Sequence, residues 1–383
     1  MTEADLEKLI AKMIDRLDGI NLLYIRKIAA QLLKIGTLSQ TNVNRLISMA
    51  EMNADIAEIN QRLMIATALN VRDLKTVYRG ILANAYTDKR FTVFLSEKPI
   101  SQEAKARLEA FVQNVYTQTA GTMRNLSNTT LASETYRKVV DDAILKTSLG
   151  MDGYKTATRE AIKELGRGGM QVRYPSGYHR RLDSSVRQNI IDGTNQIAQH
   201  ASLEIGKELG FDAVELSAHA RSAPDHEPIQ GHIFMRDQFE TLQAGGVFSD
   251  IQGRKFGPIR RPIGEWNCMH IAMAFSTAHS IPRYTDQELK AFINANHAGC
   301  EIGGKKYTIY ECVQLMRNIE TEVRLQKDIA VGAQEAQDDV LRQECQVKIN
   351  RLAQRYMVIA KAAGITPRKD RMAVEGFRAI KVR

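Results

Sequence analysis

Apolar residues recur at helical spacing through most of residues 1–150, and this periodicity constrains the fold more than any other feature. Thr2 and Asp5 can cap a first helix, whose apolar stripe contains Leu6, Leu9, Ile10, Met13, Ile14 and Leu17. We expect Gly19 and Gly36 to end the first two helices, with further helices following to residue 86. Because each stripe is wide, the helices are expected to pack on one another as an N-terminal helical domain.

Shorter elements are expected in the second half of this domain. Phe91–Leu95, shortly before Pro99, is predicted to be a short strand or an extended linker. Ser101 is predicted to start another helix, and Tyr136–Leu149 is predicted to be helical as well. Gly150 marks the expected domain boundary, because several glycines follow it within twenty residues.

The pattern changes between residues 151 and 284. A helix over 156–165 is followed by a strand over Met170–Tyr174, and Asp183 or Ser184 can cap a helix that runs to Leu209. Another strand is expected over Asp212–Ser217. The order helix, strand, helix, strand predicts a small mixed α/β domain.

Residues 285–383 are predicted to form a long helical arm with a β-hairpin and a basic tail. Thr285–Glu288 has the pattern of a capping box, and 301–307 that of a hairpin with a Gly-Gly turn. A long helical segment is expected over 308–363, with a break near Gly332. The complete chain is therefore assigned to the α+β class.

Composition excludes some classes of protein. Hydrophobic residues make up 44% and charged residues 25% of the chain, as in ordinary globular proteins. No apolar run approaches the roughly 20 residues that span a bilayer, and the N-terminus lacks the apolar core of a signal peptide, so no membrane partner is expected. The four cysteines lack disulfide-framework spacing, which indicates a reducing cytoplasm.

A net charge of +9 makes contact with nucleic acid a hypothesis, because lysine and arginine can neutralise phosphates. The tail over 361–383 has seven basic residues against two acidic ones. The candidate phosphate contacts are Arg180, Arg181, Arg368, Lys369, Arg371, Arg378 and Lys381. The alternative for each is an ordinary solvated surface. A DNA-binding regulator is disfavoured, since no helix-turn-helix or zinc-finger signature is present.

Two short segments contain most of the side chains that could carry chemistry. Val214–Phe234 holds three histidines and an arginine, and Trp266–His270 contains the only tryptophan. The motif residues are Ser217, His219, Arg221, His226, Gln230, Gly231, Trp266, Asn267, Cys268 and His270. The favoured interpretation is structural: imidazoles bridge backbone carbonyls, Arg221 pairs with Asp225 or Glu227, and Trp266 anchors a core.

Three chemical alternatives compete with this interpretation. His219, Arg221 and His226 offer the residue types of a metal-independent nuclease. His219, His226, Cys268 and His270 could bind zinc, although no zinc-finger spacing is present and no metal is favoured. A nucleophilic Cys268 with His270 as its base is disfavoured, because side chains two positions apart diverge on a helix.

Several short motifs occur in an order that resembles a known family. They are Gly177-Tyr178 through Arg187, Val214 through Arg221, Pro224-x-His226, Gln230-Gly231 and Trp266-Asn267-Cys268-x-His270. Together they resemble phage minor capsid proteins of the minor capsid protein 2 type, which are similar to Mu-type head morphogenesis proteins. The resemblance covers roughly residues 145–282. Ile229 stands where the family commonly has tryptophan, and Ala223 where arginine is frequent.

The resemblance implies a non-enzymatic head protein of a tailed phage, associated with the portal and assisting head assembly and DNA packaging or ejection. The implied partners are the portal protein, the major capsid or scaffold protein, and packaged double-stranded DNA. The implied location is the capsid interior near the portal vertex, after assembly in the host cytoplasm. Part of this broad group is linked to RNase-like or toxin-like folds, which keeps the nuclease alternative open.

Overall fold

The computed structural model describes residues 3–37, 42–128, 130, 132–148, 154–174, 176–264, 268, 270–374 and 376–382. Within these ranges the chain forms eleven α-helices and four small antiparallel sheets, which confirms the α+β class. The chain divides into two compact units, each made of three separate stretches. The first unit contains 1–10, 71–122 and 187–313, and the second contains 11–70, 123–186 and 314–383. The predicted division at residues 150 and 284 stays a prediction.

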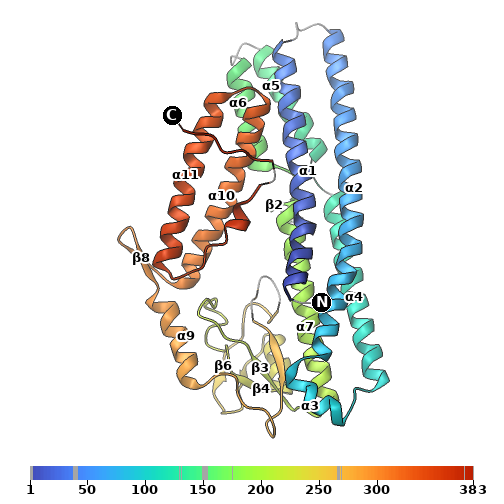
Figure 1. Cartoon of the computed structure of the whole chain (residues 1–383), viewed down its shortest axis with the longest axis vertical. Coiled ribbons are helices and arrows are strands. Elements are labelled where there is room, and N and C mark those ends of the chain that lie inside the picture. The colour runs from blue at the N-terminus through green and yellow to red at the C-terminus, as the bar shows by residue number, and fades with distance from the viewer. Residues whose placement is uncertain are drawn as a thin grey trace. The chain divides into compact units, whose positions relative to one another are not determined.

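The N-terminal helices are longer than the sequence indicated. Helix α1 spans Glu3–Thr37 and α2 spans Asn42–Tyr86 (Figure 1). The prediction that Gly19 ends a helix is wrong, because α1 continues through it. A glycine inside a helix costs about 1 kcal/mol. Burial of apolar side chains on both sides of Gly19, including Leu17 and Ile25, outweighs that cost.

The strand or linker predicted over Phe91–Leu95 is also wrong, since these residues lie within helix α3, Lys89–Glu97. Asp88 caps this helix by accepting a hydrogen bond from the Arg90 backbone N–H at 2.9 Å. The Phe91 side chain is fully buried, and its ring centroid lies 5.8 Å from that of Phe211. An N-cap and tertiary packing therefore override the extended tendency of the segment.

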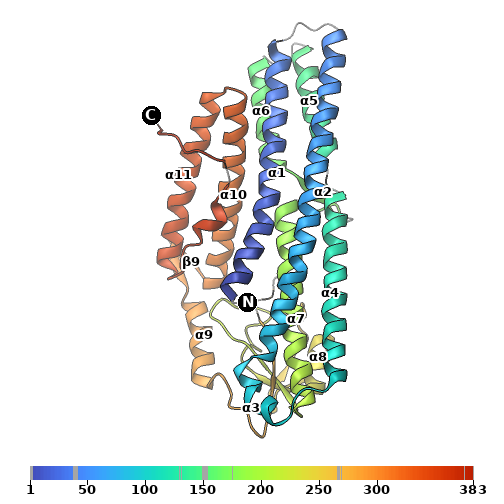
Figure 2. The same ribbon diagram turned by 45° about the vertical axis from the view of Figure 1, so that its right-hand side comes forward.

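The second unit is mainly helical. Its helices include α5, Ala132–Ser148, which packs against α6, Tyr154–Gly168. Helices α10, Ile309–Glu335, and α11, Asp339–Ala362, lie side by side and run in opposite directions (Figure 1, Figure 2). The break expected near Gly332 falls at 336–338, where Asp338 caps α11 through the Leu341 N–H.

A hairpin leads into the next long helix. Strands β1, Gln171–Arg173, and β2, His179–Arg181, pair antiparallel, and α7, Leu182–Glu208, begins directly after them. The strand and the helix predicted here are confirmed. Helix α4 covers Gln102–Asn128, and a short 3₁₀ turn, η1, covers Lys369–Met372.

The first unit contains a three-stranded antiparallel sheet in the order β4, β3, β7. These strands cover Ile233–Met235, Ala213–Leu216 and Ala272–Phe275. Every residue of β3 and β7 is buried. The core against this sheet contains Val214, Leu216, Ile229, Phe234, Phe239, Leu242, Phe248, Ile263, Cys268 and Ala272. Five residues of the predicted motif segments are thus core residues, namely Val214, Leu216, Ile229, Phe234 and Cys268.

Smaller elements complete the first unit. After β4 come helix α8, Arg236–Gln243, and the paired strands β5, Phe248–Ser249, and β6, Lys255–Phe256. Helix α9, Asp286–Ala298, starts with the predicted capping box. The predicted Gly-Gly hairpin is formed by β8, Cys300–Ile302, and β9, Lys305–Tyr307. Both local predictions are confirmed.

Candidate functional site

Ser217 joins the two motif segments in the first unit. Its backbone N–H donates to the Ile271 carbonyl at 3.0 Å, and its Oγ accepts from the Ile271 N–H at 2.9 Å. The register of β3 against β7 pairs Leu216 with Ala272, so the residues beyond each strand end meet. The loop after β3 therefore lies against Cys268 and His270.

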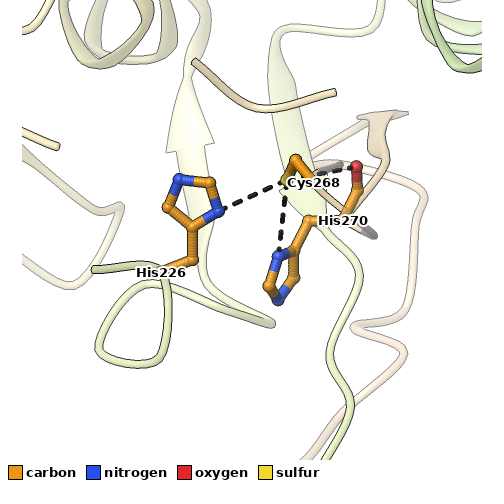
Figure 3. Close-up of side chains that lie close together, drawn as sticks. All are labelled: His226, Cys268 and His270. Carbon is orange, nitrogen blue, oxygen red and sulfur yellow. Dashed lines mark hydrogen bonds between the residues drawn. The ribbon is translucent and has the colours of Figure 1, made fainter. Parts of the chain in front are cut away.

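His226, Cys268 and His270 form a buried cluster (Figure 3). Cys268 Sγ lies 3.3 Å from His226 Nδ1 and 3.7 Å from His270 Nδ1. The exposed fractions of the three residues are 1%, 3% and 2% in chain order. The prediction that the side chains of Cys268 and His270 diverge is wrong, because both residues lie outside strands and helices.

His226 is oriented from its other ring nitrogen. Nε2 lies 2.8 Å from the Arg261 carbonyl oxygen, and the Arg261 guanidinium donates two hydrogen bonds to Asp225 at 3.0 and 2.7 Å. An imidazole bonded to a backbone carbonyl was expected and is confirmed. The expected pairing of Arg221 with Asp225 or Glu227 is wrong, since Arg261 holds Asp225 and His297 lies 2.6 Å from Glu227.

Gln230 and Ser222 surround the far side of His270. His270 Nε2 lies 3.4 Å from Ser222 Oγ and 3.5 Å from Gln230 Oε1. Gln230 Oε1 also accepts the His219 backbone N–H at 2.9 Å. The His219 ring stacks on the His270 ring with centroids 4.4 Å apart, and its Nδ1 accepts the Arg221 N–H at 3.2 Å. The structure therefore brings together four of the predicted motif residues, His219, His226, Gln230 and His270, around Cys268.

The electrostatics of the cluster favour uncharged groups. Burial, with smaller contributions from His219, His226 and Arg261, lowers the pKa of His270 to about 3. Burial also lowers the pKa values of His226 and His219 and raises that of the Cys268 thiol. Cys268 is thus a thiol between neutral imidazoles, which is not the activated thiolate of a nucleophilic enzyme.

The three residues of the nuclease alternative, His219, Arg221 and His226, do not form an open site. His226 has both ring nitrogens facing protein atoms, and His219 Nε2 is buried without a hydrogen-bond partner. Arg221 is exposed. A general base must reach the proton that it abstracts, so this geometry does not support proton transfer to a bound substrate.

Gly231 adopts a backbone conformation that suits glycine. Its φ is 72°, and an added Cβ would overlap Leu289 Cδ2 on α9. His232 is not part of the cluster of His226, Cys268 and His270, since its Nδ1 lies 2.8 Å from Asp250 Oδ2. Trp266 and Asn267 lie outside the described residues, so the expected core role of Trp266 stays a prediction.

The second unit contains a charged cluster that the sequence did not reveal. Arg181 lies 2.5 Å from Asp328, 3.0 Å from Asp183 and 3.4 Å from Asp18, and Arg324 lies 2.7 Å from Asp183. The Arg181 guanidinium is therefore occupied by carboxylates. Its neighbour Arg180 is half-buried. Contact of either arginine with DNA stays a prediction.

The basic tail is anchored on the helices of the second unit. The Arg368 N–H donates to Tyr356 Oη at 3.0 Å, and Lys327 Nζ donates to the Met372 carbonyl at 2.6 Å. Lys327 also lies 5.2 Å from the centroid of the Phe377 ring. Four predicted phosphate contacts are exposed on this segment, namely Arg368, Lys369, Arg378 and Lys381. Arg371 is half-buried, 3.8 Å from Glu320.

Comparison with known proteins gives one match. The family model described as Phage minor capsid protein 2 matches residues 1–358, well beyond the 145–282 expected from the motifs. No curated protein and no solved structure matches the chain. Among the described helices, none is both long and apolar enough to span a bilayer.

Proposed function

We propose that this chain, which belongs to the phage minor capsid protein 2 family and is a structural component of the virion, works at the portal vertex. There it contacts the portal protein and the major capsid or scaffold protein from the capsid interior. It assists head assembly and the packaging or ejection of DNA. The observation that carries this proposal is the family match over 1–358.

Reconstruction of the intact virion without imposed symmetry tests the location. We expect density for the helices of this chain at the portal vertex, and chemical cross-links from the chain to the portal protein in the same particles. Density distributed evenly over the capsid shell, with cross-links to the major capsid protein alone, would contradict the proposed location.

The proposed contact with packaged DNA rests on the charge of the tail. The chain has a net charge of +9, and Arg378 and Lys381 are exposed near its C-terminal end. Met372 is held to α10 through Lys327, and Ile380 to α11 through Gln346, whose Oε1 accepts the Ile380 N–H at 3.1 Å. Basic side chains on an anchored segment form a fixed surface that neutralises phosphates with little loss of conformational entropy.

Salt-dependent DNA binding tests this surface. The double variant R378Q/K381Q should reduce the slope of log affinity against log salt by about 1.8, since each lost phosphate contact removes about 0.9. The variant K305Q/K306Q removes the same charge from exposed residues of the β8–β9 hairpin and serves as the control. Equal slopes of log affinity against log salt for the two variants would show that net charge alone determines DNA binding, and would contradict the proposed surface.

A further inference from the structure

We propose that His226, Cys268 and His270 bind a transition-metal ion of the zinc class in tetrahedral geometry. One ligand atom from each of the three residues lies within 4.8 Å of the other two, and all three residues are buried. Thiolate and imidazole together are characteristic zinc ligands. This inference is independent of the proposed role at the portal vertex.

The spacing of the ligand atoms fits one ion. A tetrahedral ion with Zn–S of about 2.3 Å and Zn–N of about 2.0–2.1 Å holds the sulfur and each nitrogen about 3.5 Å apart. The two measured separations from Cys268 Sγ are 3.3 and 3.7 Å, one on each side of that value. The ligands can therefore close on a metal with shifts of a few tenths of an ångström.

The hydrogen-bond partners of the His226 and His270 rings also favour a cation between them. The Arg261 carbonyl can only accept, so His226 Nε2 carries a proton and its Nδ1 has a free lone pair. The His219 N–H fixes Gln230 Oε1 as an acceptor, and Ser222 Oγ donates to the Ala223 carbonyl at 3.3 Å. His270 Nε2 must then be the donor, which leaves its Nδ1 with a lone pair as well.

Two buried lone pairs therefore face one thiol, which has a single proton. Without a metal, one imidazole nitrogen lacks a donor, and an unsatisfied buried polar atom costs about 1–3 kcal/mol. A cation accepts both lone pairs and the sulfur, while the thiol proton is released to solvent. Water or another donor group takes the fourth position.

The surroundings have the form of a metal site. Each imidazole is oriented through the nitrogen that does not face the sulfur, His226 by Arg261 and His270 by Gln230, as in known zinc proteins. The ion would join the loop after β3 to the segment before β7, adding to the contacts of Ser217 with Ile271 and of His270 with Ser222, Gln230 and His219. We therefore infer a structural metal that stabilises the loop-rich part of the first unit.

Cobalt substitution tests the site directly. The full chain is purified without a metal-affinity step, stripped with a chelator and titrated with Co²⁺. We expect a thiolate-to-cobalt charge-transfer band with tetrahedral d–d bands, abolished by equimolar Zn²⁺. Cys268→Ala and His226→Ala should lose these bands, whereas the controls Cys345→Ala and His179→Gln should retain them. Absence of the bands in the parent chain, or their persistence in Cys268→Ala, would overturn the proposal.

A second measurement needs no variant and is therefore independent of folding defects. Alkylation of the stripped and Zn²⁺-loaded parent chains, followed by peptide mass spectrometry, should show zinc protecting Cys268 and leaving Cys345 unchanged. Equal labelling of Cys268 in both chains contradicts the site.

Gln230→Leu, which removes the acceptor for His270 Nε2, should weaken zinc affinity by about tenfold to hundredfold while the tetrahedral cobalt spectrum remains.

Discussion

Arg181 Nη1 lies 2.5 Å from Asp328 Oδ2, at the centre of a group of two arginines and three aspartates in the second unit. The arginines are Arg181 and Arg324, and the aspartates are Asp18, Asp183 and Asp328. With all five groups ionised the cluster would have a net charge of −1 (2 − 3). Burial, with repulsion from Asp183, raises the pKa of Asp18 to about 7, so one proton can balance the charge.

The first prediction concerns stability against pH. Because the folded-state pKa of Asp18 lies above its unfolded value of 3.8, its contribution is fully present below pH 4 and is lost as pH rises through about 7. The loss is at most about 4 kcal/mol. Asp18→Asn should flatten this part of the pH profile in chemical denaturation and be more stable than the parent at pH 8. Asp15→Asn, on the exposed face of α1, should leave the profile unchanged.

Removal of an arginine from the cluster should be costly. Arg181→Met leaves three aspartates with Arg324 alone, so the free energy of unfolding should fall by about 3–5 kcal/mol. The adjacent substitution Arg180→Met should change it by no more than about 0.5 kcal/mol. Urea denaturation of both variants at pH 7 makes the comparison, and equal effects would show that the ion pairs around Arg181 add nothing to stability.

A third prediction uses two helical glycines of the first unit. A Cβ on Gly193 of α7 would overlap the hydroxyl of Tyr78, which donates to Thr119 Oγ1 at 3.0 Å. Gly193→Ala should therefore destabilise the fold by about 1–3 kcal/mol. Gly121 of α4 has open space around its Cα, so Gly121→Ala should stabilise by about 0.5–1 kcal/mol. Thermal unfolding should show shifts of opposite sign.

The fourth prediction is a cross-link. The sulfurs of Cys300 and Cys312 lie 2.8 Å apart, and both residues are buried. Oxidised glutathione should convert the pair into an intramolecular disulfide, with two electrons and two protons passing to glutathione. The reaction should be slow at neutral pH, because burial raises the pKa of Cys312 to about 12. Mass spectrometry should find the 300–312 linkage in the parent chain, and Cys300→Ser should show none.

Features set by neighbouring residues could be predicted from the sequence. The Thr285–Glu288 capping box depends on contacts within four residues, and the Gly303–Gly304 turn depends on two positive φ angles. Residue-type arguments of this kind do not need the rest of the chain. Local sequence does not predict the helical conformation of Gly19 and Phe91, because packing against distant residues decides it.

The candidate site shows the same limit. The sequence shows the residue types of His226, Cys268 and His270, but their convergence depends on the pairing of β3 with β7 and on the irregular backbone at Cys268 and at His270. Periodicity arguments cover strands and helices only. The sequence does not predict the ion-pair cluster around Arg181 for a related reason: its members come from three stretches of the chain, at residues 18, 181–183 and 324–328, that lie more than 100 positions apart.

The second unit is assembled from three separate stretches of the chain, and this affects when it can fold during translation. A ribosome makes Asp18 and Arg181 long before Asp328, and the unit needs residues from 314 onward. Until those residues are made, the nascent chain carries the earlier helices of the unit without α10 and α11, and Arg181 without Asp328. We expect this unit to fold only after residues from 314 onward have left the ribosome, so that a chain terminated before residue 314 lacks a folded second unit.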